Sequence, residues 1–202
     1  ATLRESAPIV LSVDSLGGDV TEALRLAEIV EKLALPVTLR GRCVSACFFL
    51  FASGVGRFSG KYDVGLHRPF LVSPQQTEES LKSQKHSIVA IREYFSKKNI
   101  PSYLIDLMMS RPSTDVYWLT VGDIELLGNY TPEFEELFIA KCGYNRKITG
   151  MMIDAEISGN SQLGRQYWEQ LDRTDACIDR ISAQIFQRNL PALYKKYSGL
   201  RK

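Results

Sequence analysis

The 202-residue sequence predicts an α/β fold followed by a helical extension. Residues 8–13 form a short run rich in β-branched side chains, which indicates a buried strand. An amphipathic helix over 21–34 then leads to a second short strand at 37–39, and this order with short connections favours parallel pairing. Residues 161–187 have the spacing of one long amphipathic helix.

The remaining elements are shorter and are separated by turn residues. A polar turn at 41–46 leads into an apolar run at 46–52 of helical length, which ends at Gly54. Downstream we expect strands at 64–67 and 116–119, a polar loop at 73–80, and helices at 81–98, 101–109 and 121–127, the last capped by Thr120 and stopped by Gly128. We therefore expect an α/β domain over 1–135 and a mostly helical extension over 136–202, packed on the domain or projecting from it, with a frayed basic tail at 195–202.

The composition limits the classes of partner. The chain is 45% hydrophobic and 24% charged with a net charge of +2, which is ordinary for a globular protein and does not favour a strongly acidic partner. Few aromatic residues interleave the charges of the basic tail, so we expect no nucleic-acid binding. No run approaches the length of uninterrupted apolar residues that a membrane span needs, so we expect none.

The four cysteines do not have the spacing of a disulfide-dense miniprotein. With only two histidines to complete a tetrahedral set, we expect no metal site. We expect Cys43 and Cys47 to be small buried thiols that pack the turn at 41–46. Cys142 and Cys177 would form a disulfide in an exported protein, and the sequence leaves both redox states open.

Ser45 is the candidate nucleophile because it lies where an apolar helix begins. Unpaired N–H groups and the positive end of the helix dipole favour an oxyanion at such a position. A serine there is therefore a candidate for covalent catalysis. The alternative interpretation is that Ser45 only caps the helix, a role that serine often fills.

A base and oxyanion donors can be proposed from the same pattern. His67 ends a predicted strand, where open α/β sheets place functional groups, whereas His86 falls in the middle of a helix and is expected to be exposed. The Gly17-Gly18 turn permits positive φ and close backbone approach. The N–H groups of Gly18 and Ala46 are therefore the candidate oxyanion donors. The alternative is that Gly17 and Gly18 only form a turn, where glycine is common.

Three segments carry a resemblance to a known family. The sequence VDSLGGDV at 13–20 resembles the strand-to-turn segment (D/N)SPGG-x-V of the Clp-type serine peptidases, GRCVS at 41–45 is similar to their G-x-x-x-S turn, and GLHRP at 65–69 resembles their histidine-bearing strand. Order and approximate spacing agree across residues 8–70 and more loosely to about 130. The chain departs from the family at Leu16, where proline is usual, so we expect a less rigid turn. The family also has a further strand and helix before this segment, so we expect a trimmed chain or one that lacks that layer.

The resemblance implies a β-α-β spiral of the Clp/crotonase type and a homo-oligomeric serine peptidase that acts on extended peptides or unfolded proteins without a cofactor. It implies Ser45 as nucleophile, His67 as general base, and the Gly18 and Ala46 amides as oxyanion donors. The third member of the family's triad precedes a short aromatic strand and a helix. Asp115 matches this context when one residue is inserted, and Asp106 is a weaker substitute.

The cysteine-flanked serine turn and the long C-terminal helix look like the predicted periplasmic Clp-like proteins of bacteria. This resemblance implies a location in the periplasm or cell envelope, with the cytoplasm as the alternative.

Three other functions remain open. Related envelope peptidases pair serine with lysine, and Lys82 and Lys85 lie at a suitable distance. A catalytic lysine must be buried to lose its proton, whereas both of these lie in a polar stretch and are expected to be solvated. A crotonase-like enzyme would use the same paired amides to hold the enolate of an acyl-CoA. A non-catalytic scaffold or binding module is the third possibility, since a fold does not fix a function.

Overall fold

The structure, a computed structural model, describes residues 9–61, 63–70 and 77–198. The chain divides into two compact units, which we call the α/β unit (Val10–Thr131) and the helical unit (the described residues from Pro132 onward). The division falls after Thr131, four residues before the boundary predicted from the sequence.

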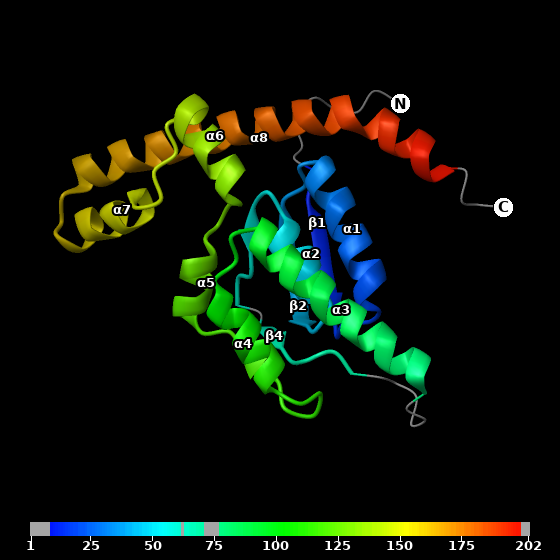
Figure 1. The fold of residues 1–202 in the computed structure, drawn as a ribbon. Helices are drawn as coiled ribbons and strands as arrows, with labels where there is room; N and C mark the ends of the chain where they lie inside the picture. Colours follow the sequence, from blue (N-terminus) through cyan, green and yellow to red (C-terminus); the bar gives the residue numbers. More distant parts are fainter. Residues whose placement is uncertain (1–8, 62, 71–76, 199–202) are drawn as a thin grey trace. The chain divides into compact units, whose positions relative to one another are not determined.

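One small mixed sheet lies in the α/β unit (Figure 1). β1, β2, β4 and β5 are hydrogen-bonded neighbours in that order, and β3 also pairs with β2. β1, β3 and β4 run parallel to β2, as predicted for the first two strands, whereas β5 runs antiparallel to β4. The strands are β1 (Leu11–Ser15), β2 (Val37–Val44), β3 (Arg57–Phe58), β4 (Val64–Leu66) and β5 (Tyr117–Trp118).

The helices of the α/β unit confirm most predicted elements. They are α1 (Val20–Lys32), α2 (Cys47–Ser53), α3 (Glu78–Lys97), α4 (Ser102–Ser110) and α5 (Val121–Leu127). Two boundaries differ. β2 continues to Val44, so the turn before α2 is shorter than the predicted 41–46. α3 begins within the predicted loop, because the Thr77 hydroxyl accepts a hydrogen bond from the Ser80 N–H and caps the helix; residues 73–76 of that loop lie outside the described residues.

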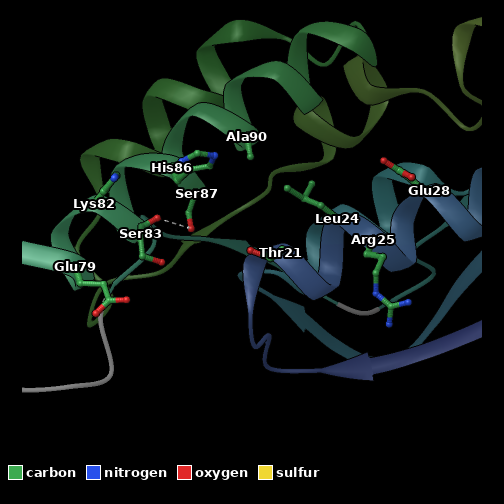
Figure 2. Close-up of a pocket in the computed structure, with 10 residues that line it drawn as sticks. All are labelled: Thr21, Leu24, Arg25, Glu28, Glu79, Lys82, Ser83, His86, Ser87 and Ala90. Atoms are coloured by element: carbon green, nitrogen blue, oxygen red, sulfur yellow. Dashed lines mark hydrogen bonds between the residues drawn. The ribbon is translucent and has the colours of Figure 1, made fainter. Parts of the chain in front are cut away.

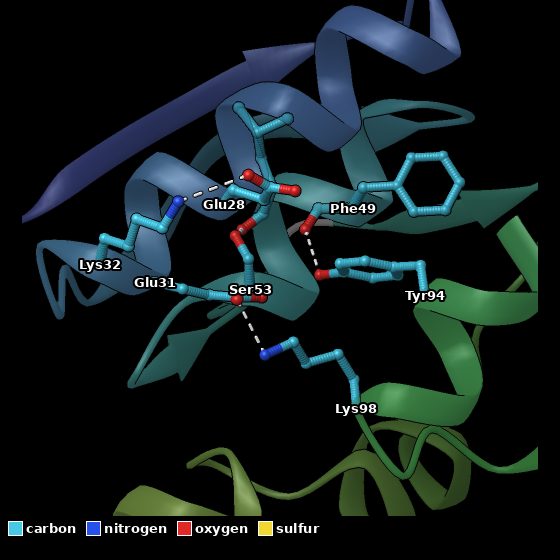
Figure 3. Close-up of polar contacts among 8 residues, drawn as sticks. Glu28, Glu31, Lys32, Phe49, Ser53, Tyr94 and Lys98 are labelled. Carbon is cyan, nitrogen blue, oxygen red and sulfur yellow. Dashed lines mark hydrogen bonds and ion pairs between the residues drawn. The ribbon is translucent and has the colours of Figure 1, made fainter. Parts of the chain in front are cut away.

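α2 is the centre of the core of the α/β unit. Phe48, Phe49 and Phe51 on this helix are fully buried, and α2 contacts α1 as well as β1, β2 and β4. The Phe48 and Phe95 rings lie 5.6 Å apart, and the Tyr94 hydroxyl donates a 2.9 Å hydrogen bond to the Phe49 carbonyl (Figure 3). α3 is thereby fixed against α2 through both apolar packing and a polar contact.

An ion pair also joins α1 to the C-terminal end of α3. Lys98 Nζ lies 2.8 Å from a carboxylate oxygen of Glu31, and both side chains are largely shielded from solvent (Figure 3). The more exposed pair of Glu28 and Lys32 on α1, at 3.5 Å, contributes little because water screens it. This ion pair therefore ties α1 to the C-terminal end of α3.

Asp123 is a buried carboxylate that holds α4, β5 and α5 together. It accepts hydrogen bonds from the hydroxyls of Tyr103 and Tyr117, and also from the N–H and hydroxyl of Thr120, forming the predicted cap of α5. Burial alone would raise the pKa of Asp123, but these hydrogen bonds outweigh it and lower the pKa below its usual range. Burial and the bond to Asp123 raise the pKa of Tyr103 to about 12.

This cluster predicts a loss of stability at both pH extremes. The lowered Asp123 pKa stabilises the folded state above the pKa of the unfolded carboxyl, about 4, and that stabilisation disappears as the pH falls further. The raised Tyr103 pKa stabilises the fold below about pH 10, the unfolded value, and that contribution is lost as the pH rises toward 12. Urea unfolding as a function of pH tests this. In Tyr103→Phe the alkaline loss should shrink; an unchanged alkaline profile would contradict the assignment.

The helical unit contains α6 (Pro132–Cys142), α7 (Ile148–Ile157) and α8 (Ser161–Ser198). α7 packs along α8 (Figure 1). A disulfide between Cys142 and Cys177 joins α6 to α8. α8 extends beyond the predicted end at 187 and continues past Pro191, so residues 195–198 are helical and the expectation of a frayed tail is wrong for them. Residues 199–202 lie outside the described residues. Within the described chain, no helix has both the length and the apolar character needed to cross a bilayer.

Candidate active site

Three predicted functional segments follow the carboxyl ends of neighbouring parallel strands. Gly17-Gly18 follows β1, Ser45 follows β2, and His67 follows β4. The Ser45 N–H donates a 2.8 Å hydrogen bond to the Gly65 carbonyl, which joins the serine turn to the histidine strand. The carboxyl ends of parallel strands share one edge of the sheet, which is the usual place for a functional site in open α/β sheets.

Ser45 lies in a strained backbone conformation. Its φ is +59°, in the left-handed region that costs an L-residue about 1–2 kcal/mol. Ala46, not Ser45, is the N-cap residue of α2, and no side chain caps that helix, so the capping interpretation of Ser45 is wrong. A half-buried serine on a strained strand-to-helix turn has the geometry of a nucleophile elbow.

His67 is buried and held in one orientation by a backbone carbonyl. Its side chain is at the end of β4, and the residue is only 7% exposed. His67 Nδ1 lies 2.9 Å from the Arg68 carbonyl oxygen. Because a carbonyl only accepts, Nδ1 carries the proton in the neutral ring, and Nε2 is the nitrogen that can take a proton. This is the tautomer that a general base needs.

Ser45, His67 and Gly18 line one cavity of about 540 Å³. The structure therefore brings together the predicted nucleophile, the predicted base and one of the predicted oxyanion donors. Phe70, whose ring lies 5.7 Å from the His67 ring, and Ser113 also line this cavity. A cavity of this volume is within the range of small-molecule and peptide sites.

Asp115 has a different partner from the one that the resemblance implies. Its exposed carboxylate accepts a 2.7 Å hydrogen bond from the Arg111 guanidinium. Among the described residues no hydrogen bond joins Asp115 to His67, whose Nδ1 is occupied by the Arg68 carbonyl. Asp106, the weaker substitute, is exposed on α4. The structure therefore supplies a carbonyl as the group that orients His67, and the role of Asp115 in a triad stays a prediction.

The two glycines after β1 have different structural roles. Gly17 has a φ of +103°, and a Cβ there would lie 2.7 Å from Ser45 Cβ and 2.9 Å from the Val44 carbonyl oxygen. This confirms the predicted close backbone approach, because only glycine fits against the serine turn. A Cβ on Gly18 would meet no atom within 4 Å, so that residue faces open space in the cavity. Neither the Gly18 nor the Ala46 N–H donates to another backbone group of the described chain, which leaves both available to an oxyanion.

A disulfide closes the serine turn. Cys43 and Cys47, expected as free thiols, are bonded to each other, so that expectation is wrong. The turn at Ser45 reverses the chain between the end of β2 and the start of α2 and brings the two Cα atoms to 5.2 Å, within the range that a disulfide spans. With the Cys142–Cys177 bond, all four cysteines are paired.

The two disulfides should stabilise their units by different amounts. The chain-entropy model gives about 2 kcal/mol for a bond across a separation of 4 and about 4 kcal/mol across a separation of 35. Trp118 lies in the α/β unit and Trp168 in the helical unit, so single-tryptophan variants report the unfolding of each unit separately. We expect Cys142→Ser with Cys177→Ser to lower the free energy of unfolding that Trp168 reports more than Cys43→Ser with Cys47→Ser lowers the free energy that Trp118 reports. The reverse order would contradict the entropic account.

Sequence reasoning missed the Arg68 carbonyl, because a backbone group has no signature in the sequence. The other candidates do not line the cavity: His86 and Lys82 line a neighbouring hollow, and Lys85 is exposed on α3. Within the described residues no group of histidine, cysteine and acidic side chains has the arrangement of a metal site. A comparison of the chain with models of known protein families found no match, and a comparison with curated proteins found none either.

Proposed function

We propose that the chain is a serine hydrolase of the Clp/crotonase type that cleaves extended peptides through an acyl-enzyme on Ser45. One observation carries this proposal: Ser45, on its strained turn, shares a cavity with a buried histidine whose Nε2 is left as the proton acceptor. The ordered likeness of residues 8–70 to the Clp-type peptidases supports the spiral fold and the choice of a peptide substrate.

The proposed reaction begins when His67 Nε2 takes the proton of Ser45 Oγ as the oxygen attacks the scissile carbonyl. The Gly18 and Ala46 N–H groups bind the oxyanion of the tetrahedral intermediate. Collapse of this intermediate breaks the C–N bond, and the leaving amine takes the proton from His67. Water, deprotonated by the same histidine, then attacks the acyl-enzyme; the ester C–O bond breaks, and His67 returns the proton to Ser45 Oγ. Through its Nδ1 bond, the Arg68 carbonyl keeps the imidazole in the required tautomer, and Asp115 is the alternative orienting group that the resemblance implies.

The strained conformation of Ser45 favours this proposal over the other functions. An enolate-stabilising enzyme needs the paired amides but has no use for a serine held at positive φ. A serine–lysine enzyme needs a buried, neutral lysine, and both Lys82 and Lys85 are exposed. A scaffold needs neither the strained serine nor the oriented histidine.

We further propose that the protein acts in an oxidising compartment such as the periplasm or cell envelope. The pairing of all four cysteines supports this, because disulfides persist in such compartments. We also propose a homo-oligomer, as the resemblance implies. Exposed apolar side chains on the helical unit, including Ile157 at 81% and Tyr194 at 74%, support self-association. Light scattering coupled to size exclusion should give a mass above that of one chain.

Proteolysis of an unfolded protein tests the peptidase function. Fluorescein-labelled β-casein should release fluorescent peptides when incubated with the oxidised protein, and Ser45→Ala should abolish the release. Equal release by Ser45→Ala would reject Ser45 as the nucleophile. If micromolar acyl-CoA bound instead and casein stayed intact, the crotonase-like function would replace this proposal.

A further inference from the structure

A second hollow opens between α1 and α3. It has a volume of about 670 Å³, and its lining residues lie on one face of each helix (Figure 2). α1 contributes Thr21, Leu24, Arg25 and Glu28, and α3 contributes Glu79, Lys82, Ser83, His86, Ser87 and Ala90. We call this hollow the α1/α3 groove.

The α1/α3 groove adjoins the cavity that contains Ser45. Ser83 and Ser87 line both hollows, so the two meet along one face of α3. The Ser87 hydroxyl donates a 3.2 Å hydrogen bond to the Ser83 carbonyl, which keeps this side chain against its own helix (Figure 2). A chain bound at Ser45 can therefore continue into the α1/α3 groove past two small side chains.

The lining of the α1/α3 groove points to an uncharged or mixed-charge polypeptide as its ligand. Leu24 and Ala90 provide apolar surface, and the Leu24 side chain extends toward α3 (Figure 2). The charged side chains around them are of both signs: Arg25 and Lys82 are basic, whereas Glu28 and Glu79 are acidic. Their charges cancel, so the groove does not select a polyanion such as a nucleic acid or the phosphates of coenzyme A.

From this geometry we infer that the α1/α3 groove binds the segment of an extended polypeptide that flanks the bond held at Ser45, with an apolar side chain against Leu24 and Ala90. This inference rests on the proposed function and adds a substrate-binding site to it. The groove makes the enzyme select unfolded chains, because only an extended segment can occupy both hollows at once. The groove lies between two helices, so the bound segment would contact helix side chains and would not pair with a strand.

Binding to an inactive variant tests the groove separately from catalysis. In the Ser45→Ala background, Ala90→Trp places an indole in the α1/α3 groove, and Val89→Trp places the same group on the preceding residue of α3. Val89 is 54% exposed and lines neither hollow, so it is the matched control. Fluorescence anisotropy of fluorescein-labelled β-casein should show at least a tenfold rise in Kd for Ala90→Trp and less than a twofold change for Val89→Trp.

Equal Kd values for Ala90→Trp and Val89→Trp, or no casein binding by Ser45→Ala itself, would overturn the inference. If Ala90→Trp does not fold, hydrogen–deuterium exchange of Ser45→Ala with and without casein provides a second test of the groove. Casein should slow exchange in residues 21–28 and 79–90, and unchanged exchange there would again overturn the inference. Fluorophosphonate labelling of the wild-type protein is measured in parallel. If the wild type is not labelled but casein still binds, the catalytic function is rejected and the groove remains a polypeptide-binding site.

Discussion

Replacing His67 by alanine lowers the rate at which a fluorophosphonate labels Ser45 by about 10³-fold, the usual size of a general-base effect. The reason is that His67 Nε2 is the acceptor for the Ser45 proton, and its ring is fixed by the 2.9 Å contact of Nδ1 with the Arg68 carbonyl. The measurement is the second-order labelling rate from quenched time points.

Asp115→Asn is the matched control for this prediction. The structure pairs Asp115 with Arg111 and not with His67, so we expect the labelling rate of Asp115→Asn to stay within about threefold of the wild type. A loss as large as that of His67→Ala would show that Asp115 orients the histidine during the reaction, as the resemblance implies. In that case the Arg68 carbonyl would not be the orienting group of the active state.

Replacing Gly17 by alanine is expected to have the second-largest effect. The new Cβ would lie 2.7 Å from Ser45 Cβ at a φ of +103°, so the turn after β1 and the serine turn must separate. Left-handed strain and overpacking together lower the free energy of unfolding by about 3 kcal/mol. A displacement of Ser45 by about 1 Å or less lowers the labelling rate by about 100-fold. Urea denaturation and labelling kinetics measure the two effects.

Gly18→Ala makes the same substitution at the neighbouring residue and is the control for Gly17→Ala. A Cβ there meets no atom within 4 Å, so the free energy of unfolding should stay within about 1 kcal/mol of the wild type, or rise because the unfolded chain loses freedom. Equal destabilisation by Gly17→Ala and Gly18→Ala would contradict the close approach of Gly17 to Ser45.

The sequence predicted the elements whose side chains repeat with a clear period or that begin with a strong cap. The amphipathic pattern of α1 and the Thr120 cap of α5 both appear as expected, and the strand ends that carry Gly17, Ser45 and His67 follow from the order of the strands. These features are local, or they follow from parallel pairing, so one sequence suffices to predict them.

Features that depend on tertiary distance could not be predicted in the same way. The Cys43–Cys47 bond requires a reversal of the chain at Ser45, which only the structure provides. Asp123 was not singled out, because its role depends on hydroxyls of Tyr103 and Tyr117 that come from other elements. Arg111 and Asp115 lie four residues apart, but opposite charges at such a distance are common in turns and often do not pair. The sequence therefore did not predict this ion pair.

Intact mass after incubation with a fluorophosphonate tests the central claim most directly. The oxidised wild-type protein should gain the mass of one adduct, located on Ser45 by peptide mapping, and Ser45→Ala should gain none. An adduct of equal yield on Ser45→Ala would contradict the account. So would an unmodified wild-type protein whose two disulfides are intact, because an activated serine in an assembled site must react.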